Sequence, residues 1–157
     1  MNSLRHRLRS ERGAELIEFA LVFPVLLLVV LGIVDFGFLF QRMEVVTNAA
    51  REGARMAVLP GYTKADVENR VCNYMLTGGV PMTTCGATGS TVVNVDMAFP
   101  IAMPSGTPMT AKRVEVVYTH NYLFIGPFAS WFGGSFTTVP IRGVAIMRDE
   151  VQAPAGP

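Results

Sequence analysis

The longest hydrophobic pattern in the chain is a continuous apolar run of 22 residues from Phe19 to Phe40, in which Asp35 is the only ionisable residue. A helix of this length extends about 33 Å, which is enough to cross a hydrocarbon core of about 30 Å. Apolar residues occupy every helical face of the run, whereas a surface helix of a soluble domain has one polar face. A buried core helix of this length is rare in a chain of 157 residues. The pattern therefore predicts one transmembrane span at about residues 19–40.

Basic residues gather in front of this run. Residues 1–13 hold a single acid, Glu11, and four arginines: Arg5, Arg7, Arg9 and Arg12. Because basic residues stay on the cytoplasmic side of a span, we expect the N-terminus in the cytoplasm and the residues after about 42 to be exported. A cleaved secretory signal fits less well, because its apolar region has about 7–15 residues and a small-x-small site follows it closely.

Helical signals continue beyond the apolar run to Leu59, and Pro60-Gly61 ends them. One helix over residues 14–59 would be about 69 Å long. In its last turns small residues recur at every fourth position: Ala49, Gly53 and Ala57. This spacing lets another helix or a sheet approach closely. Packing against the chain's own exported domain is the favoured interpretation, and helix–helix assembly is the alternative.

Residues 60–157 show the patterns of a small exported α+β domain. A short helix is predicted to begin after Thr63 as its N-cap, and its apolar face consists of Val67, Val71 and Met75. Alternating patterns predict strands over residues 91–99, 113–124 and 137–147. Pro140 places the last strand at a sheet edge or a bulge. The expected fold is α+β: a long N-terminal helix, then a short helix and an antiparallel sheet.

Cys72 and Cys85 are the only cysteines, and both follow the predicted span. Export to an oxidising compartment predicts a disulfide between them. It closes a loop of about 14 residues, for which the chain-entropy estimate is about 3 kcal/mol. A zinc site is not expected, because the only histidines, His6 and His120, are predicted on opposite sides of the membrane.

The remaining residues argue against an enzyme. The chain has no nucleophile motif and no glycine-rich phosphate loop, and His120 has no evident catalytic partner. We expect His120 to be a partly exposed strand residue. A formal net charge of +1 argues against nucleic acid as a partner, because nucleic-acid-binding domains concentrate basic residues. No cofactor, metal or small-molecule substrate is expected.

A glycine-flanked loop is predicted over residues 126–134, and it contains three aromatic residues: Phe128, Trp131 and Phe132. These rings could fill the core of the exported domain, lie on the membrane surface or bind a partner. The core is the favoured interpretation, and the other two stay open.

Acidic residues mark both ends of the span. Glu15 and Glu18 precede the apolar run, and Asp35 lies about 25 Å along the helix from Glu18. An acid in or at the edge of the hydrocarbon is costly and usually has a function. Asp35 either extends to water at the outer interface or makes an intramembrane polar contact with a partner.

The sequence around the first two acids resembles a known processing site. A basic leader ends in Gly13, Glu18 is the fifth residue after it, and the aromatic Phe19 follows, as in class III prepilins. The longer stretch RGAELIEFALVFPVLLLVVLGIVDFG, followed by NAAREGARMAV, resembles the TadE-like family of pseudopilins over residues 12–59. Members of this family are minor pilin-like components of the tight-adherence (Flp, type IVc) pilus system.

This resemblance implies a structural subunit for pilus assembly. It would span the bacterial inner membrane once, with its C-terminal domain periplasmic or extracellular. A prepilin peptidase would cut between Gly13 and Ala14, and Glu18 with Phe19 would dock the subunit against its neighbours. The implied partners are the membrane, the peptidase, other pilin-like subunits and the pilus assembly platform. Whether the subunit enters the fibre is left open.

Physical chemistry supports a role for Glu18 independently. After cleavage Ala14 carries a free α-amine with a reference pKa of about 7.7–8.0, and Glu18 lies one helical turn away. The two charges can neutralise each other within the chain or between neighbours in a filament. Alternatively, Glu15 and Glu18 only stabilise the start of the helix through its dipole. The rival function is a membrane-anchored exported domain that binds a ligand and does not polymerise.

Overall fold

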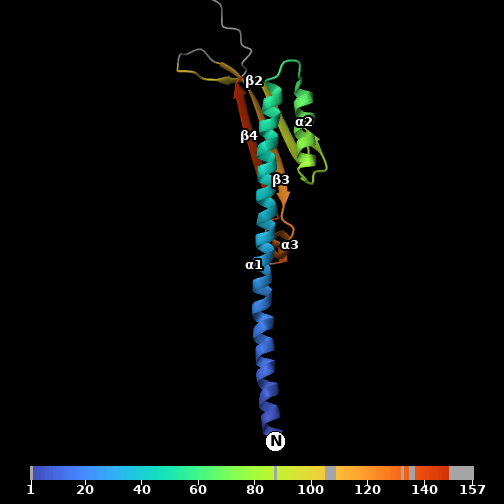
Figure 1. Cartoon of the computed structure of the whole chain (residues 1–157), viewed down its shortest axis with the longest axis vertical. Helices are drawn as coiled ribbons and strands as arrows, with labels where there is room; N and C mark the ends of the chain where they lie inside the picture. Colours follow the sequence, from blue (N-terminus) through green and yellow to red (C-terminus); the bar gives the residue numbers. More distant parts are fainter. Residues whose placement is uncertain (1, 87, 105–108, 132, 135–136, 149–157) are drawn as a thin grey trace, which may run out of the picture. The chain divides into compact units, whose positions relative to one another are not determined.

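The computed structural model describes residues 2–86, 88–104, 109–131, 133–134 and 137–148, apart from the side chains of residues 2–12 and 131 (Figure 1). The elements follow one another in the order α1 (Asn2–Ala57), α2 (Lys64–Thr77), β1 (Cys85–Gly86), β2 (Thr91–Ile101), β3 (Met109–Asn121), α3 (Ile125–Trp131) and β4 (Thr138–Arg148). The α+β class predicted from the sequence is confirmed.

The chain divides into two compact units. The first consists of Met1–Gly37 and Tyr122–Thr137, and the second of Phe38–Asn121 and Thr138–Pro157. The sequence suggested boundaries after residues 13 and 59. That division stays a prediction. In the structure Tyr122–Thr137 forms one compact unit with the N-terminal part of α1, although more than 80 residues separate them in the sequence.

Helix α1 is continuous over 56 residues. It ends at Ala57, close to the predicted end, but it begins at Asn2 within the leader rather than at Ala14. Pro24 lies inside the helix, where its ring removes one backbone donor. From Gly13 onward α1 is long and apolar enough to cross a membrane, and its most apolar stretch is not buried by the rest of the protein.

Helix α2 begins as the sequence predicts, with Thr63 as N-cap in extended backbone geometry. The Thr63 hydroxyl accepts a hydrogen bond from the Asp66 amide, and the Asp66 carboxylate accepts one from the Thr63 amide at 2.8 Å. This reciprocal capping box satisfies two amides that have no partner within the helix. Hydrogen bonds from the Thr63 side chain and backbone lower the pKa of Asp66 below its usual value. The predicted apolar face is buried: Val67, Val71 and Met75.

The sheet has the strand order β1-β2-β3-β4. Its three long strands are antiparallel, whereas the two-residue β1 pairs in parallel with β2, so the sheet is mixed rather than purely antiparallel. Strand β4 is an edge strand, as Pro140 predicts, because a missing backbone donor is tolerated there. Buried residues alternate with partly buried or exposed residues along β2 and β3, and the buried face carries Val93, Val95, Val114, Val116 and Tyr118.

Two predicted boundaries are wrong near residue 125. The second predicted strand, residues 113–124, forms strand only to Asn121, and the predicted loop at residues 126–134 contains most of helix α3. Pro127 falls in the first turn of α3, where a helix needs no backbone donor from it. Of the three aromatic residues in the predicted loop, the side chain of Trp131 and the whole of Phe132 lie outside the described residues.

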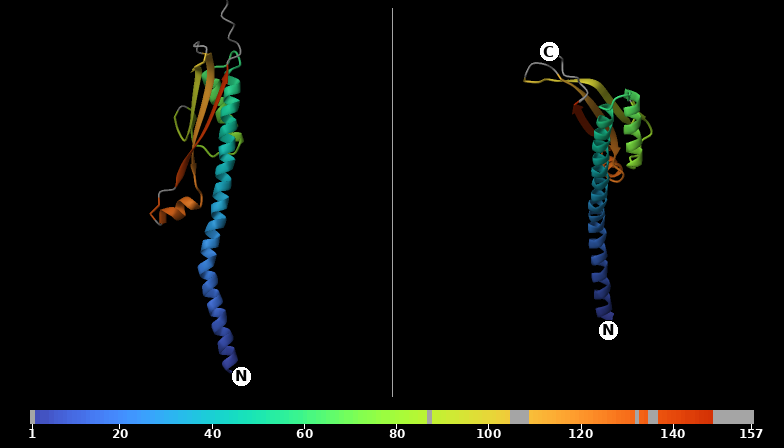
Figure 2. Two further views of the ribbon diagram at one scale, coloured as in Figure 1. Left: turned by 90° about the vertical axis from the view of Figure 1, so that its left-hand side faces the viewer. Right: turned by 45° about the horizontal axis from the view of Figure 1, so that its top comes forward.

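The core of the second unit lies between the sheet and two helices. The last turns of α1 and helix α2 cover the same face of the sheet (Figure 2). A Cβ added at Gly53 would lie 2.5 Å from Val71 of α2 and 3.1 Å from Val114 of β3. The missing side chain at this position therefore lets α1, α2 and the sheet meet at one point. The Cys72–Cys85 disulfide joins α2 to β1.

His120 is buried, which corrects the expectation of partial exposure. Its side chain is 1% exposed, and Nη1 of Arg42 lies 2.7 Å from Nδ1 of the imidazole. His120 lies in phase with Val114, Val116 and Tyr118 on β3, so strand alternation turns it toward the helices. Its role in the described structure is a polar contact between α1 and β3 within the second unit.

Candidate functional site

The candidate processing junction lies within helix α1. Gly13 is half-buried and Ala14 is exposed, and a Cβ added at Gly13 would meet no atom within 4 Å. The leader backbone of residues 2–12 is helical, but its side chains, including the four arginines, lie outside the described part of the structure. The junction is therefore not blocked by any described part of the chain.

Both glutamates that follow the junction are exposed. Neither Glu15 nor Glu18 makes a hydrogen bond or an ion pair with any side chain that the structure describes. Phe19 is 63% exposed and stacks on Phe23, with 5.3 Å between the ring centroids. The start of the apolar run thus presents an exposed carboxylate directly beside an exposed aromatic pair.

The apolar surface continues along α1. Large hydrophobic side chains on all sides of the helix are at least one-third exposed, among them Leu21, Val25, Leu26, Val29 and Ile33. A soluble protein rarely exposes a contiguous apolar surface of this length, because contact between apolar surface and water is unfavourable. Lipid or other apolar helices are the surroundings that this surface requires.

Asp35 is a buried acid of the first unit. It is 1% exposed, so the interpretation that it extends to water is wrong. One carboxylate oxygen accepts a hydrogen bond from the Leu123 amide at 3.0 Å. The other accepts from the Phe124 amide at 2.9 Å and from the Ile125 amide at 2.7 Å. The carboxylate therefore holds three successive backbone amides at the start of α3.

Sequence reasoning singled out Asp35 but not its partners. The three amides lie 88 to 90 residues away, and a backbone amide leaves no mark in the pattern of side chains. Two further contacts join the same parts of the first unit. Phe36 meets Tyr122 edge to face, with ring centroids 6.3 Å apart, and a Cβ on Gly32 would touch Ile125 at 3.8 Å.

The small residues near the end of α1 belong to the second unit rather than to the first. Ala49 and Ala57 are buried in the core of the second unit, and Gly53 contacts α2 and β3 there. In the described structure this strip packs against the chain's own domain, the interpretation favoured from the sequence. Among the described residues no three His, Cys, Asp or Glu side chains cluster as metal ligands would.

Comparison with known proteins links the N-terminal part of the chain to a protein family. A protein-family model described as TadE-like protein matches residues 13–55. No curated protein and no solved structure matches the chain. The matched segment contains the junction, Glu18, the span, Asp35 and most of the small-residue strip, and the sequence resemblance to this family is confirmed there. The match supports a pilin-like, membrane-associated protein of the tight-adherence pilus system.

Proposed function

We propose, starting from the TadE-like match over residues 13–55, that this chain is a minor pilin-like subunit that takes part in assembly of a tight-adherence pilus. A prepilin peptidase removes residues 1–13, and α1 holds the mature subunit in the cytoplasmic membrane with its second unit exported. From there it joins other pilin-like subunits at the assembly platform. Its role is structural and involves no catalysis.

The exposed carboxylate of Glu18 is the observation that carries this proposal. It lies one helical turn from Ala14, at the start of the apolar surface, and no described side chain neutralises it. Cleavage would create an amine at Ala14 where unpaired charge is costly. In a filament, Glu18 can pair with the amine of a neighbouring subunit and help to set the axial register between the two helices.

The exposed apolar surface supports the same function. A helix that is apolar on all sides suits lipid before assembly and the helices of neighbouring subunits after it. Transfer from one surrounding to the other costs little hydrophobic free energy, because both are apolar. A tethered ligand-binding domain also needs a span, but it needs neither the cut after Gly13 nor the charge of Glu18.

A substitution at the junction tests the processing step. Gly13→Leu should leave residues 1–13 attached and abolish pili, because a bulky side chain is placed at the bond that the peptidase must reach. The intact mass of the membrane-extracted protein reports cleavage. Gly37→Leu is the matched control, since a Cβ at Gly37 also meets no atom within 4 Å and lies far from the junction. Normal cleavage of the Gly13→Leu chain would contradict the proposed processing site.

A further inference from the structure

The segment Tyr122–Thr137 has an unusual composition for a connection between two strands. Its 16 residues include no charged side chain, and six of them are aromatic: Tyr122, Phe124, Phe128, Trp131, Phe132 and Phe136. Within its described part, Leu123 is 54% exposed and Phe128 is 42% exposed. These side chains are absent from the hydrophobic core of the second unit, so Phe128 does not fill that core as the sequence suggested.

Backbone amides at the beginning of this segment have hydrogen-bond partners. The first amides of a helix have no partner within the helix. Here the Asp35 carboxylate accepts hydrogen bonds from the amides of Leu123, Phe124 and Ile125, at distances of 2.7 to 3.0 Å. The same contacts satisfy the buried acid, so that neither the carboxylate nor the amides need water.

Backbone groups at the end of α3 and at the base of the segment are hydrogen-bonded as well. The Gly134 amide donates to the Ala129 carbonyl at 2.8 Å and the Gly133 amide to the Ser130 carbonyl at 3.1 Å. Gly133 has a φ of +79°, so this is a Schellman cap at the end of α3. A further bond joins the Tyr122 amide to the Thr137 carbonyl at 3.1 Å and closes the base of the segment. A backbone in hydrocarbon requires this degree of internal satisfaction.

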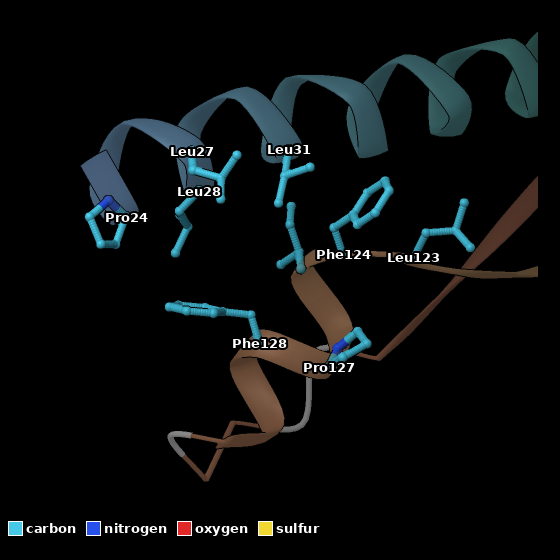
Figure 3. Close-up of a pocket in the computed structure, with 9 residues that line it drawn as sticks. Pro24, Leu27, Leu28, Leu31, Leu123, Phe124, Pro127 and Phe128 are labelled. Carbon is cyan, nitrogen blue, oxygen red and sulfur yellow. The ribbon is translucent and has the colours of Figure 1, made fainter. Parts of the chain in front are cut away.

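An apolar groove lies between α3 and the spanning helix. It has a volume of about 300 Å³, and its walls are Pro24, Leu27, Leu28, Leu31, Leu123, Phe124, Ile125, Pro127 and Phe128. In Figure 3, Leu28 and Leu31 extend from α1 toward α3, and the Phe128 ring lies on the opposite wall. No lining side chain carries a polar group.

The predicted span places the groove at the depth of the hydrocarbon core. Pro24 and Leu31 follow Phe19 by 5 and 12 residues. At 1.5 Å per residue these positions lie about 8 and 18 Å into a core of about 30 Å. The groove walls are continuous with the apolar surface of α1, so the solvent at this depth is lipid rather than water.

We propose that Tyr122–Trp131 is a second membrane-embedded element, which the hydrogen bonds of Asp35 hold against the spanning helix α1. Phospholipid acyl chains occupy the groove between α3 and α1. Acyl chains match a groove that offers only hydrocarbon and aromatic contacts, because such a lining provides no polar group to select a protein partner. The proposal requires the membrane span. It does not depend on leader cleavage or pilus assembly.

Quenching by brominated lipid tests the lipid contact. Trp131→Phe combined with Phe128→Trp places the only tryptophan of the full-length chain in the groove. In phosphatidylcholine vesicles brominated on their acyl chains, its emission should be several-fold weaker than in unbrominated vesicles. Trp131→Phe with Tyr74→Trp is the matched control, because Tyr74 lies on α2 in the second unit and should not be quenched. Equal emission of the Phe128→Trp protein in both vesicles would overturn the lipid assignment.

The role of Asp35 is tested in the same background. Asp35→Ala removes both carboxylate oxygens and with them all three hydrogen bonds, so quenching should fall toward that of the control and the emission should shift to longer wavelength. Asp35→Asn keeps one carbonyl oxygen, and its quenching should be intermediate. Unchanged quenching in Asp35→Ala would show that Asp35 does not hold this segment against α1.

A second copy of the chain is the alternative occupant of the groove. Absence of quenching in the Phe128→Trp protein that retains Asp35, together with disulfide-linked dimers of a Phe128→Cys variant, would show that a second copy fills the groove instead of lipid.

Discussion

Glu18→Gln should abolish pili while leaving the protein in the membrane at normal levels and cleaved at the normal site. Glutamine keeps the size and hydrogen-bonding capacity of the side chain but deletes its charge. Membrane insertion should become slightly easier, because a carboxylate at the edge of the hydrocarbon is costly. Assembly should fail because the amine of a neighbouring Ala14 loses its counter-charge. Pili are counted by electron microscopy, and contacts between subunits are measured by crosslinking to other pilin-like proteins.

The control for this variant is Glu44→Gln. Glu44 is also an exposed acid of α1, but it lies beyond the apolar run. The same change there should leave pili and crosslinks unaffected. If Glu18→Gln produces pili at wild-type numbers, Glu18 has no role in assembly, and a tethered binding domain becomes the better description.

Gly143→Ala should destabilise the second unit strongly, although it adds only one methyl group. An added Cβ would lie 2.8 Å from the Val46 carbonyl oxygen, 3.0 Å from the Val46 carbonyl carbon and 3.1 Å from the Thr47 Cα. All three are backbone atoms of α1, so no side chain can rotate away, and α1 and β4 must separate. Overpacking typically costs 1–3 kcal/mol. We expect a loss of about 3 kcal/mol, or roughly 12 °C or more in the melting temperature of a unit of this size.

The measurement is thermal unfolding of the full-length chain in detergent, followed by near-ultraviolet circular dichroism. Gly37→Ala is the control, because a Cβ there meets no atom within 4 Å and alanine favours the helix. It should unfold at or slightly above the wild-type temperature. Equal melting temperatures for Gly143→Ala and the wild type would mean that α1 and β4 do not pack as closely as the structure describes.

The elements that could be predicted from the sequence have periodic side chains or local chemistry. Val67, Val71 and Met75 recur at helical spacing, and Thr63 with Asp66 forms a cap within four residues, so helix α2 was recognisable. Strands β2 and β3 were recognisable because buried residues alternate along them with residues that are partly buried or exposed. The same alternation places His120 on the buried face. Its burial was therefore predictable from the strand pattern, and the expectation of partial exposure is wrong.

The features that could not be predicted depend on contacts between distant segments. Asp35 was identifiable as a costly acid, but its partners are backbone amides 88 to 90 residues away. Helix α3 has only seven residues and two of its first three are Gly126 and Pro127, so local propensity argues against it. It forms where Asp35 caps one end and Gly133 closes the other. The two-residue strand β1 is likewise too short to leave a pattern.

Processing after Gly13 is measured by the intact mass of the wild-type chain extracted from the membranes of piliated cells. The mature protein should consist of residues 14–157 and begin with a free amine at Ala14, because the cut after Gly13 creates the charge with which Glu18 pairs. N-terminal sequencing of the same sample should read Ala-Glu-Leu-Ile-Glu. A chain that still carries residues 1–13 in cells with normal pili would contradict both the cleavage and the pairing of Glu18 with the new amine.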